Sequence, residues 1–216
     1  MIPRYTRPEM ARIWTDQRKF ETWLEIELMA CEALAELGEI SREAVQEIKE
    51  KSKFDIRRID EIEKVTKHDV LAFLTNVGEA IGPLSKYLHY GLTSSDILDT
   101  SLALLLKEAS EIILQDIHRL LDVLKKKAFE YKETLMIGRT HGIHAEPTTF
   151  GLKMALWYDE MKRNLTRMER AKDAVSVGKI SGAVGTFAHI RPFVEEYVCK
   201  RLGLKPAAIS TQIVQR

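Results

Sequence analysis

The sequence predicts an all-α protein. Three observations lead to this fold class. Apolar residues recur every three or four positions along most of the 216-residue chain, strand-like alternation is almost absent, and glycine and proline concentrate at a few breaks between periodic segments. Since 45% of the residues are hydrophobic, the chain has enough apolar material to bury a sizeable core.

The first part of the chain predicts one long helix followed by shorter ones. Apolar residues keep helical spacing over 15–38, and the last residue of that range is a glycine suited to end a helix. Shorter helices are expected over 41–51 and 55–65, each opened by a side-chain oxygen that can accept from a free backbone N–H. Asp69 is expected to cap the next helix, which ends near 82–83.

Two long helices are expected in the second part. The first covers 95–132, where apolar residues continue at helical spacing without glycine or proline. At about 1.5 Å rise per residue it is roughly 50 Å long, which is typical of an elongated bundle or coiled coil. The second covers 148–177, and a last helix over 192–202 begins with proline and is followed by glycine. Glycine-rich loops are expected over 138–147 and 178–186.

A short loop over 89–93 separates the shorter helices from the long ones. We therefore expect a small N-terminal helical domain over 1–93 and the first part of an elongated long-helix bundle over 94–216. Three or more helices are needed to close a core around the wide apolar stripes of such helices. The bundle is thus expected to be incomplete in this chain, and self-association is expected to complete it.

The composition disfavours several classes of protein. The 33 basic and 32 acidic residues are interleaved, without the long basic stripe that nucleic-acid binding requires. The longest apolar run, 102–106, is far shorter than the roughly 20 residues that cross a bilayer, and no targeting segment is evident, so we expect no membrane partner and a cytoplasmic location. Cys31 and Cys199 lie in helical patterns and are expected to be small buried residues rather than a disulfide or metal ligands.

Four polar clusters fall in loops or at helix starts, where side chains are accessible. The first covers 138–149 and contains His141, His144 and Glu146. His141 suits proton transfer because an imidazole changes charge near neutral pH, and Glu146 or another carboxylate can orient it. Taken alone, a structural role fits His141 equally well. A mononuclear metal site needs three or four well-placed ligands, and the sequence supplies no further cluster of ligands near these two histidines and one glutamate, so no metal is expected.

The other clusters suit an anionic, oxygen-rich ligand. Lys67, His68 and Asp69 put cationic groups beside a helix start, although a cap at Asp69 with two solvated neighbours explains them equally well. The segment 90–96 supplies a glycine and more hydroxyls than one cap requires. The last cluster combines the glycines of 181–186 with the hydroxyl and amide groups of Ser210, Thr211 and Gln212. No cluster matches a phosphate-binding loop or a dinucleotide fingerprint.

Together these segments resemble the bacterial adenylosuccinate lyase family. The matching motifs are YGLTSSD over 90–96, GRTHGIHAEPTTFG over 138–151 and GKISGAVGT over 178–186, in the order of the family. The resemblance extends from Arg4-Tyr5 to Gln212, essentially the whole chain. Other members of the fumarase/aspartase superfamily have different residues after the histidine loop and around Thr93-Ser94. The resemblance implies a fumarase/aspartase-like helical fold.

The resemblance also implies an activity: cleavage of adenylosuccinate to AMP and fumarate, and of succinylaminoimidazole carboxamide ribotide to its carboxamide and fumarate, without a cofactor or metal. It implies that His141 donates a proton to the leaving nitrogen and that His68 assists near the phosphate. The side chains implied on the nucleotide side are Arg4, Tyr5, Lys67 and Asp69, and those implied to hold the succinyl and neighbouring groups are Thr93, Ser94, Thr140 and Gln212. The family further implies a homotetramer with shared active sites.

One motif of the family is missing from the chain. The flexible loop Ser-Ser-x-Met-Pro-x-Lys-x-Asn-Pro, which supplies the serine thought to act as the base, does not occur in it. We therefore expect a portion of a longer enzyme that holds the acid but not the base and is almost inactive alone. Two other interpretations stay open at this point: a helical assembly module without chemistry, and a sister fumarate-releasing lyase such as argininosuccinate lyase.

Overall fold

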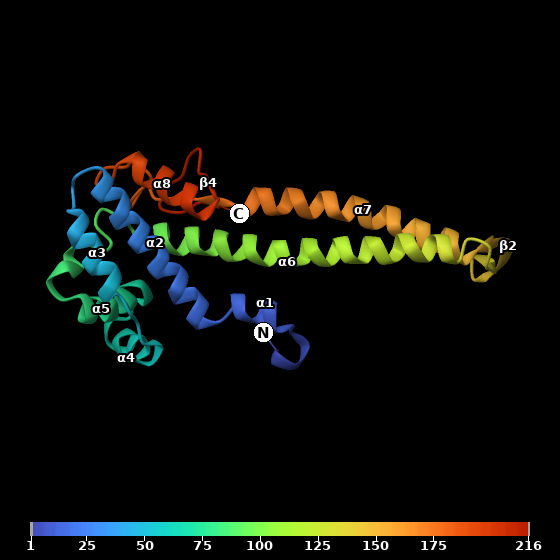
Figure 1. Ribbon diagram of the computed structural model, residues 1–216, viewed down its shortest axis with the longest axis horizontal. Coiled ribbons are helices and arrows are strands. Elements are labelled where there is room, and N and C mark those ends of the chain that lie inside the picture. The colour runs from blue at the N-terminus through green and yellow to red at the C-terminus, as the bar shows by residue number, and fades with distance from the viewer. Residues whose placement is uncertain (1, 216) are drawn as a thin grey trace. The chain divides into compact units, whose positions relative to one another are not determined.

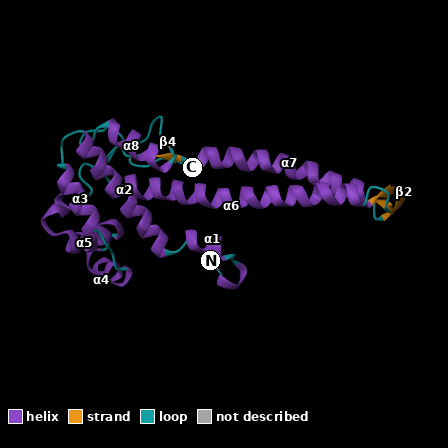
Figure 2. Ribbon diagram, viewed as in Figure 1, coloured by secondary structure: helices purple, strands orange, loops and turns teal. Residues whose placement is uncertain are grey.

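The computed structural model describes residues 2–215, and helices dominate it (Figures 1 and 2), which confirms the all-α fold class. The chain divides into two compact units. Unit 1 contains residues 1–108 and 174–216, and unit 2 contains residues 109–173. None of the described helices is both long and apolar enough to cross a membrane. The expected domain boundary near residue 93 stays a prediction.

Unit 1 is a group of helices around α2. Its elements are η1 (Pro3–Tyr5), α1 (Pro8–Ile13), α2 (Asp16–Glu36), α3 (Arg42–Lys51), α4 (Ile56–Thr66), α5 (Asp69–Ile81), η2 (Gly82–Tyr87), the start of α6 (Ser94–Glu130) and α8 (Pro192–Leu202). Helix α2 packs against α3 and α8, and α4 packs against α5. Two very short strands, β3 (Val177–Gly178) and β4 (Lys205–Pro206), pair in parallel.

Capping residues stand at several ends of these helices, and Gly38 follows α2 as the sequence predicts. The Thr15 side chain accepts a hydrogen bond from the Arg18 N–H and starts α2. After its end, Gly38 adopts a left-handed φ of 75°, and the following N–H, of Glu39, donates to the Leu34 carbonyl at 2.9 Å. A residue with a Cβ adopts this backbone conformation only with strain, which is why glycine ends the helix. Gly203 ends α8 in the same conformation, with φ 63°.

The core of unit 1 is centred on four aromatic side chains. Phe73 of α5 is fully buried and stacks on Phe20 of α2 with ring centroids 5.7 Å apart. Trp23 meets the edge of Phe73 at 5.5 Å, and Phe54 lies at 6.2 Å. Stacked and edge-on pairs satisfy the quadrupoles of the rings and add to the stabilisation from burial. The two cysteines are free and buried, as expected from the helical pattern.

Unit 2 contains the rest of α6, a hairpin of strands β1 (Leu135–Thr140) and β2 (Ile143–Thr149), and most of α7 (Phe150–Val175). The two helices approach closely next to the hairpin, where a Cβ on Gly151 would lie 2.5 Å from the Ala128 carbonyl oxygen. Nearby, the ring centroids of Tyr131 and Phe150 are 5.2 Å apart. This close crossing fixes the base of the hairpin.

The hairpin corrects one prediction. A loop is expected over 138–147, but only His141 and Gly142 form a turn, and the other residues belong to two antiparallel strands with a register shift between Ile137 and Arg139. The pattern hid the strands because both faces of this ribbon are largely exposed, so no alternation of apolar and polar residues is required. Hydrogen bonds between the backbones of the two strands, rather than burial, hold it together.

Candidate active site

The start of α6 is organised by the buried side chain of Asp96. Its Oδ2 accepts from the backbone N–H of Thr93 at 2.9 Å, and the Asp96 N–H donates to the Thr93 carbonyl. The first contact is one half of a capping box, in which an acidic residue in the first turn binds back to the residue before the helix. Thr93 and Ser94, both expected at the site, are thereby held half-buried at the first turn of a long helix.

His68 caps the neighbouring helix α5 and faces Ser94. Its Nδ1 accepts from the backbone N–H of Leu71 at 3.2 Å, as an asparagine or aspartate oxygen does at other N-caps. A nitrogen that accepts carries no proton in the neutral ring, so the proton is assigned to Nε2. Nε2 lies 3.4 Å from Ser94 Oγ and can donate to it. Two predicted clusters far apart in sequence therefore meet here.

The cap of α5 also corrects a prediction. Asp69 was expected to be the N-cap, but His68 holds this position and Asp69 lies in the first turn, where its Oδ1 accepts from the Val70 N–H at 2.7 Å. The reason is the preceding residue. Lys67 adopts a left-handed conformation with φ 55° at the end of α4, so that the extended backbone of His68 enters α5. The Lys67 and His68 side chains are exposed at this junction.

A fully buried ion pair joins α6 to the glycine-rich segment 178–186. Lys179 Nζ lies 2.5 Å from Asp96 Oδ1, and neither side chain is exposed at all. Lys179 Nζ also donates to the Gly182 carbonyl at 3.1 Å. The backbone N–H groups of Ser181 and Gly182 donate to the two oxygens of Asp96 at 3.0 and 3.1 Å. The Asp96 carboxylate thus receives three backbone donors and one ammonium donor.

In the last predicted cluster, the segment 181–186 packs directly against Ser210. Ser181 Oγ and Ser210 Oγ lie 2.8 Å apart, which joins the two halves of that cluster. Gly185 has φ 80°, and a Cβ on it would lie 2.2 Å from the Ser210 carbonyl oxygen. This glycine therefore serves the approach of two chain segments. Gln212, two residues further on, is exposed.

His141 occupies the turn of the hairpin in unit 2. Thr140 pairs with Ile143, so His141 and Gly142 form a two-residue loop, and their φ angles are 51° and 77°. Positive φ at both loop positions defines a type I′ turn, whose twist suits the flanking strands. The side chains of His141 and Thr140 are exposed, and in the described residues no hydrogen bond joins His141 to Glu146. The turn presents the imidazole to solvent.

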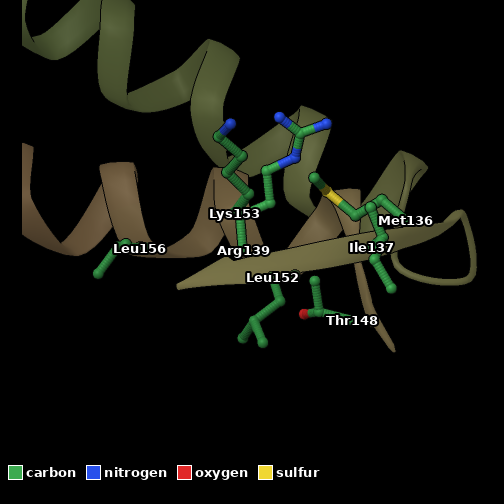
Figure 3. A pocket seen from close by; sticks show the side chains of 8 residues that line it. Met136, Ile137, Arg139, Thr148, Leu152, Lys153 and Leu156 are labelled. Carbon is green, nitrogen blue, oxygen red and sulfur yellow. The ribbon is translucent and has the colours of Figure 1, made fainter. Parts of the chain in front are cut away.

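A groove of about 790 Å³ lies beside this hairpin (Figure 3). Its lining includes Arg139 of β1 and Lys153 of α7, whose nitrogen-bearing ends point to the same side, together with Leu152 and Leu156. His141 is not among the residues that line it. The groove pairs two cationic groups with apolar walls, and the predicted acid is not part of its lining.

The predicted site residues are thus distributed over both units. Unit 1 brings His68 to Ser94, and unit 2 carries His141 and Thr140. Arg4 lies in η1 with its guanidinium carbon 4.7 Å from the ring centroid of the exposed Tyr5. Among residues 2–215, no group of three or more histidine, cysteine or acidic side chains is arranged to hold a metal ion.

Three buried charged residues were not among the predicted site residues: Lys179, Glu195 and Glu27. Lys179 lies in the motif over 178–186, and Glu195 lies in α8. Glu195 accepts from the Ile180 N–H at 2.8 Å, and burial, together with the charge of Asp96, raises its pKa. Glu27 binds the backbone and Nδ1 of His89 at 2.7 and 2.6 Å. A sequence signal exists only for Lys179, a charged residue inside a stretch of small and apolar residues, whereas Glu27 and Glu195 lie within two residues of another glutamate.

Comparison with known proteins places the chain in a family of enzymes. A family model described as lyase matches residues 4–216, and the chain belongs to this family. Among solved structures, it resembles a fumarate lyase from Mesorhizobium sp. BNC1 with a TM-score of 0.89 and 28% identity, over 95% of this chain and 50% of the other. A 3-carboxy-cis,cis-muconate lactonizing enzyme from Pseudomonas putida gives a TM-score of 0.87 at 26% identity, over 95% and 49% of the two chains.

The curated relatives are more specific. The chain is 61% identical to adenylosuccinate lyase of Bacillus subtilis over all 216 residues, which is 50% of that protein. It is 57% identical to adenylosuccinate lyase of Staphylococcus saprophyticus, again over the whole chain and 50% of the relative. The expected resemblance is confirmed. The chain spans about half the length of these relatives.

Proposed function

We propose that the full-length protein containing this chain is an adenylosuccinate lyase of purine nucleotide biosynthesis. It cleaves adenylosuccinate to AMP and fumarate, and succinylaminoimidazole carboxamide ribotide to its carboxamide and fumarate. The observation that carries the proposal is the 61% identity with the Bacillus subtilis enzyme, which extends over every residue of this chain. The contact between His68 and Ser94 supports it, because it gathers two of the expected substrate-binding segments.

The chemistry requires three functions at the site. A proton must leave the carbon next to a carboxylate, the negative charge that develops must be stabilised, and the departing nitrogen must be protonated. We assign the last step to His141, whose imidazole is exposed at a hairpin turn. His68 assists it near the phosphate. The base is assigned to a segment outside this chain.

The substrate-binding roles follow the positions of the side chains. Lys67 and His68 put cationic or hydrogen-bonding groups at the start of α5, a position that favours an anion such as the nucleotide phosphate. Thr93 and Ser94 offer hydroxyls at the start of α6 for the succinyl carboxylates. The remaining residues proposed to bind substrate are Arg4, Tyr5 and Asp69 on the nucleotide side and Thr140 and Gln212 on the succinyl side.

We further propose a homotetramer with shared active sites. Its support is the apolar surface of unit 2, on which Phe129, Leu152 and Leu156 are each exposed by more than 60%. Such a surface on long helices is typical of a bundle that other helices complete. Sedimentation of the full-length protein tests this point, and a monomer at micromolar concentration contradicts it.

The activity is tested by adding adenylosuccinate to the full-length protein and following fumarate release by ultraviolet absorbance, with AMP identified as the second product. Argininosuccinate serves as the comparison substrate, because the fold is shared with lyases and cycloisomerases of other substrates. Turnover of argininosuccinate alone would assign a sister activity. Absence of turnover with either substrate, and of AMP binding in calorimetry, would refute the proposal and favour an assembly module.

A further inference from the structure

We propose that the buried pair of Asp96 and Lys179 is a positioning element of the substrate site, which holds Thr93 and Ser94 in the geometry that binds the succinyl group. The inference rests on the proposed function for the role of these two hydroxyl residues. Asp96 and Lys179 themselves are fully buried, so neither side chain touches the substrate. They act through the backbone that they bind.

Burying the two charges of Asp96 and Lys179 costs free energy. An isolated ionised group in a protein interior loses its hydration, and only close partners offset this loss. Lys179 Nζ meets Asp96 Oδ1 at 2.5 Å and the Gly182 carbonyl at 3.1 Å. A hydrophobic pair would fill the same space without this cost. The charges therefore serve something that apolar side chains cannot supply.

The Asp96 carboxylate binds backbone N–H groups of two separate segments. Asp96 binds the N–H of Thr93 on its own helix, and it binds the N–H groups of Ser181 and Gly182 from a segment more than 80 residues away. Hydrogen bonds to an ionised acceptor are shorter and stronger than those to a neutral one. One carboxylate thus holds the peptide between Leu92 and Thr93 and connects it to the glycine-rich segment.

The position of Thr93 affects the candidate substrate site through Ser94. Ser94 is the residue after Thr93, whose N–H Asp96 holds, and Ser94 Oγ lies 3.4 Å from His68 Nε2. If the carboxylate becomes neutral, the N–H of Thr93 loses its charged acceptor and the first turn of α6 can rotate. A displacement of about 1 Å can lower activity a hundredfold at an enzyme site. The pair thereby affects binding without contacting the ligand.

Glu195 provides a matched control. Its carboxylate is also buried and also holds the glycine-rich segment, through the N–H of Ile180 at 2.8 Å. It binds Ile180 rather than Thr93. Glu195→Gln therefore removes a buried carboxylate charge from the same region and leaves the anchor of Thr93 in place.

The test uses the full-length protein and the double variant Asp96→Asn/Lys179→Met, which removes both charges with little change in volume and leaves no unpaired charge. We expect a folded protein whose KM for adenylosuccinate rises at least about tenfold while kcat changes less, because ground-state and transition-state binding are weakened together. Hydrogen exchange of the peptide covering 91–96 should become faster. Glu195→Gln should leave KM and this exchange within about twofold of the parent, since its role is confined to Ile180.

Two outcomes overturn the proposal. A folded double variant with unchanged KM and unchanged exchange over 91–96 shows that the pair does not position this segment. If the double variant and Asp96→Asn both fail to fold while Glu195→Gln folds, the pair serves stability alone. The exchange measurement needs no substrate, so it is independent of the proposed function. Failure of the parent protein to release fumarate would refute the activity, whereas unchanged exchange would refute the positioning role.

Discussion

Replacing His141 by asparagine separates its chemistry from its place in the hairpin. His141 and Gly142 form a type I′ turn with φ angles of 51° and 77°. Asn-Gly is among the most favoured pairs for this turn, whereas glutamine, the usual isosteric replacement for histidine, has no such preference. We expect His141→Asn to keep the hairpin intact and to abolish proton donation. His141→Gln changes both properties at once.

The loss of the general acid and the strain at the turn differ in size, so the experiment can distinguish them. A left-handed conformation costs an ordinary residue about 1–2 kcal/mol, and histidine and asparagine occupy it several times more often than most residues. Glutamine at this turn should therefore cost about 1 kcal/mol, which corresponds to about a fivefold change in the population of the native turn. A general acid contributes about 10²- to 10⁴-fold to the rate. The loss of the acid thus exceeds any effect of the turn.

The assay compares kcat for fumarate release by the full-length parent, His141→Asn and His141→Gln, with thermal unfolding of each protein measured alongside. We expect both variants to lose at least about a hundredfold in kcat, and His141→Asn to keep the parental melting temperature. If His141→Asn retains more than a tenth of the parental kcat, His141 is not the proton donor. If it loses activity and also unfolds early, the turn was assigned wrongly.

Three further predictions concern stability and reactivity. Phe73→Ala should lower the free energy of unfolding by about 3–5 kcal/mol in urea titrations, because the ring is fully buried among other aromatic rings. Gly151→Ala should cost about 1–3 kcal/mol, because its Cβ would lie 2.5 Å from the Ala128 carbonyl oxygen and the helices must separate. Burial raises the pKa of Cys31 and Cys199 to about 12, so a thiol reagent at pH 8 should modify them only after denaturation.

The raised thiol pKa values also give a pH dependence. A protonated thiol is favoured by the folded state, so this stabilisation is complete below the ordinary pKa of 9.0 and is lost as the pH rises toward about 12. For Phe73→Ala and Gly151→Ala, controls on the same helices are Leu71→Ala in α5 and Glu160→Ala in α7, since both side chains are exposed and should change stability by less than about 1 kcal/mol. Fast labelling of the native thiols, or equal losses for buried and exposed positions, would contradict the packing described.

Most of the helices could be predicted because their signals are local. Helical periodicity and capping residues depend on side chains within one or two turns, so the sequence sufficed to place α2, α3, α4 and α8 within one or two residues of their observed ends. The hairpin of β1 and β2 could not be predicted in this way. Its strands are stabilised by each other's backbone, and their exposed side chains carry no periodic pattern.

In the candidate site too, some features could be predicted from the sequence and others depend on the tertiary fold. His68, Ser94 and His141 could be singled out from their neighbours in the sequence and from the family resemblance. Their roles stay proposals, but the contact of His68 with Ser94 is a property of the fold. Sequence spacing contains no information on that contact, because 25 residues and two helical elements lie between them.

The chain's sequence by itself determined the all-α class, the ends of most helices and the resemblance to adenylosuccinate lyases, because these depend on local patterns and on motif order. Only the tertiary structure decided that His68 rather than Asp69 caps α5, that His141 stands at a type I′ turn, and that Asp96 is paired with Lys179. The physical reason is that burial and long-range hydrogen bonding arise from the meeting of distant segments. The Asp96 carboxylate binds residues more than 80 positions away, and local sequence patterns contain no information on such contacts.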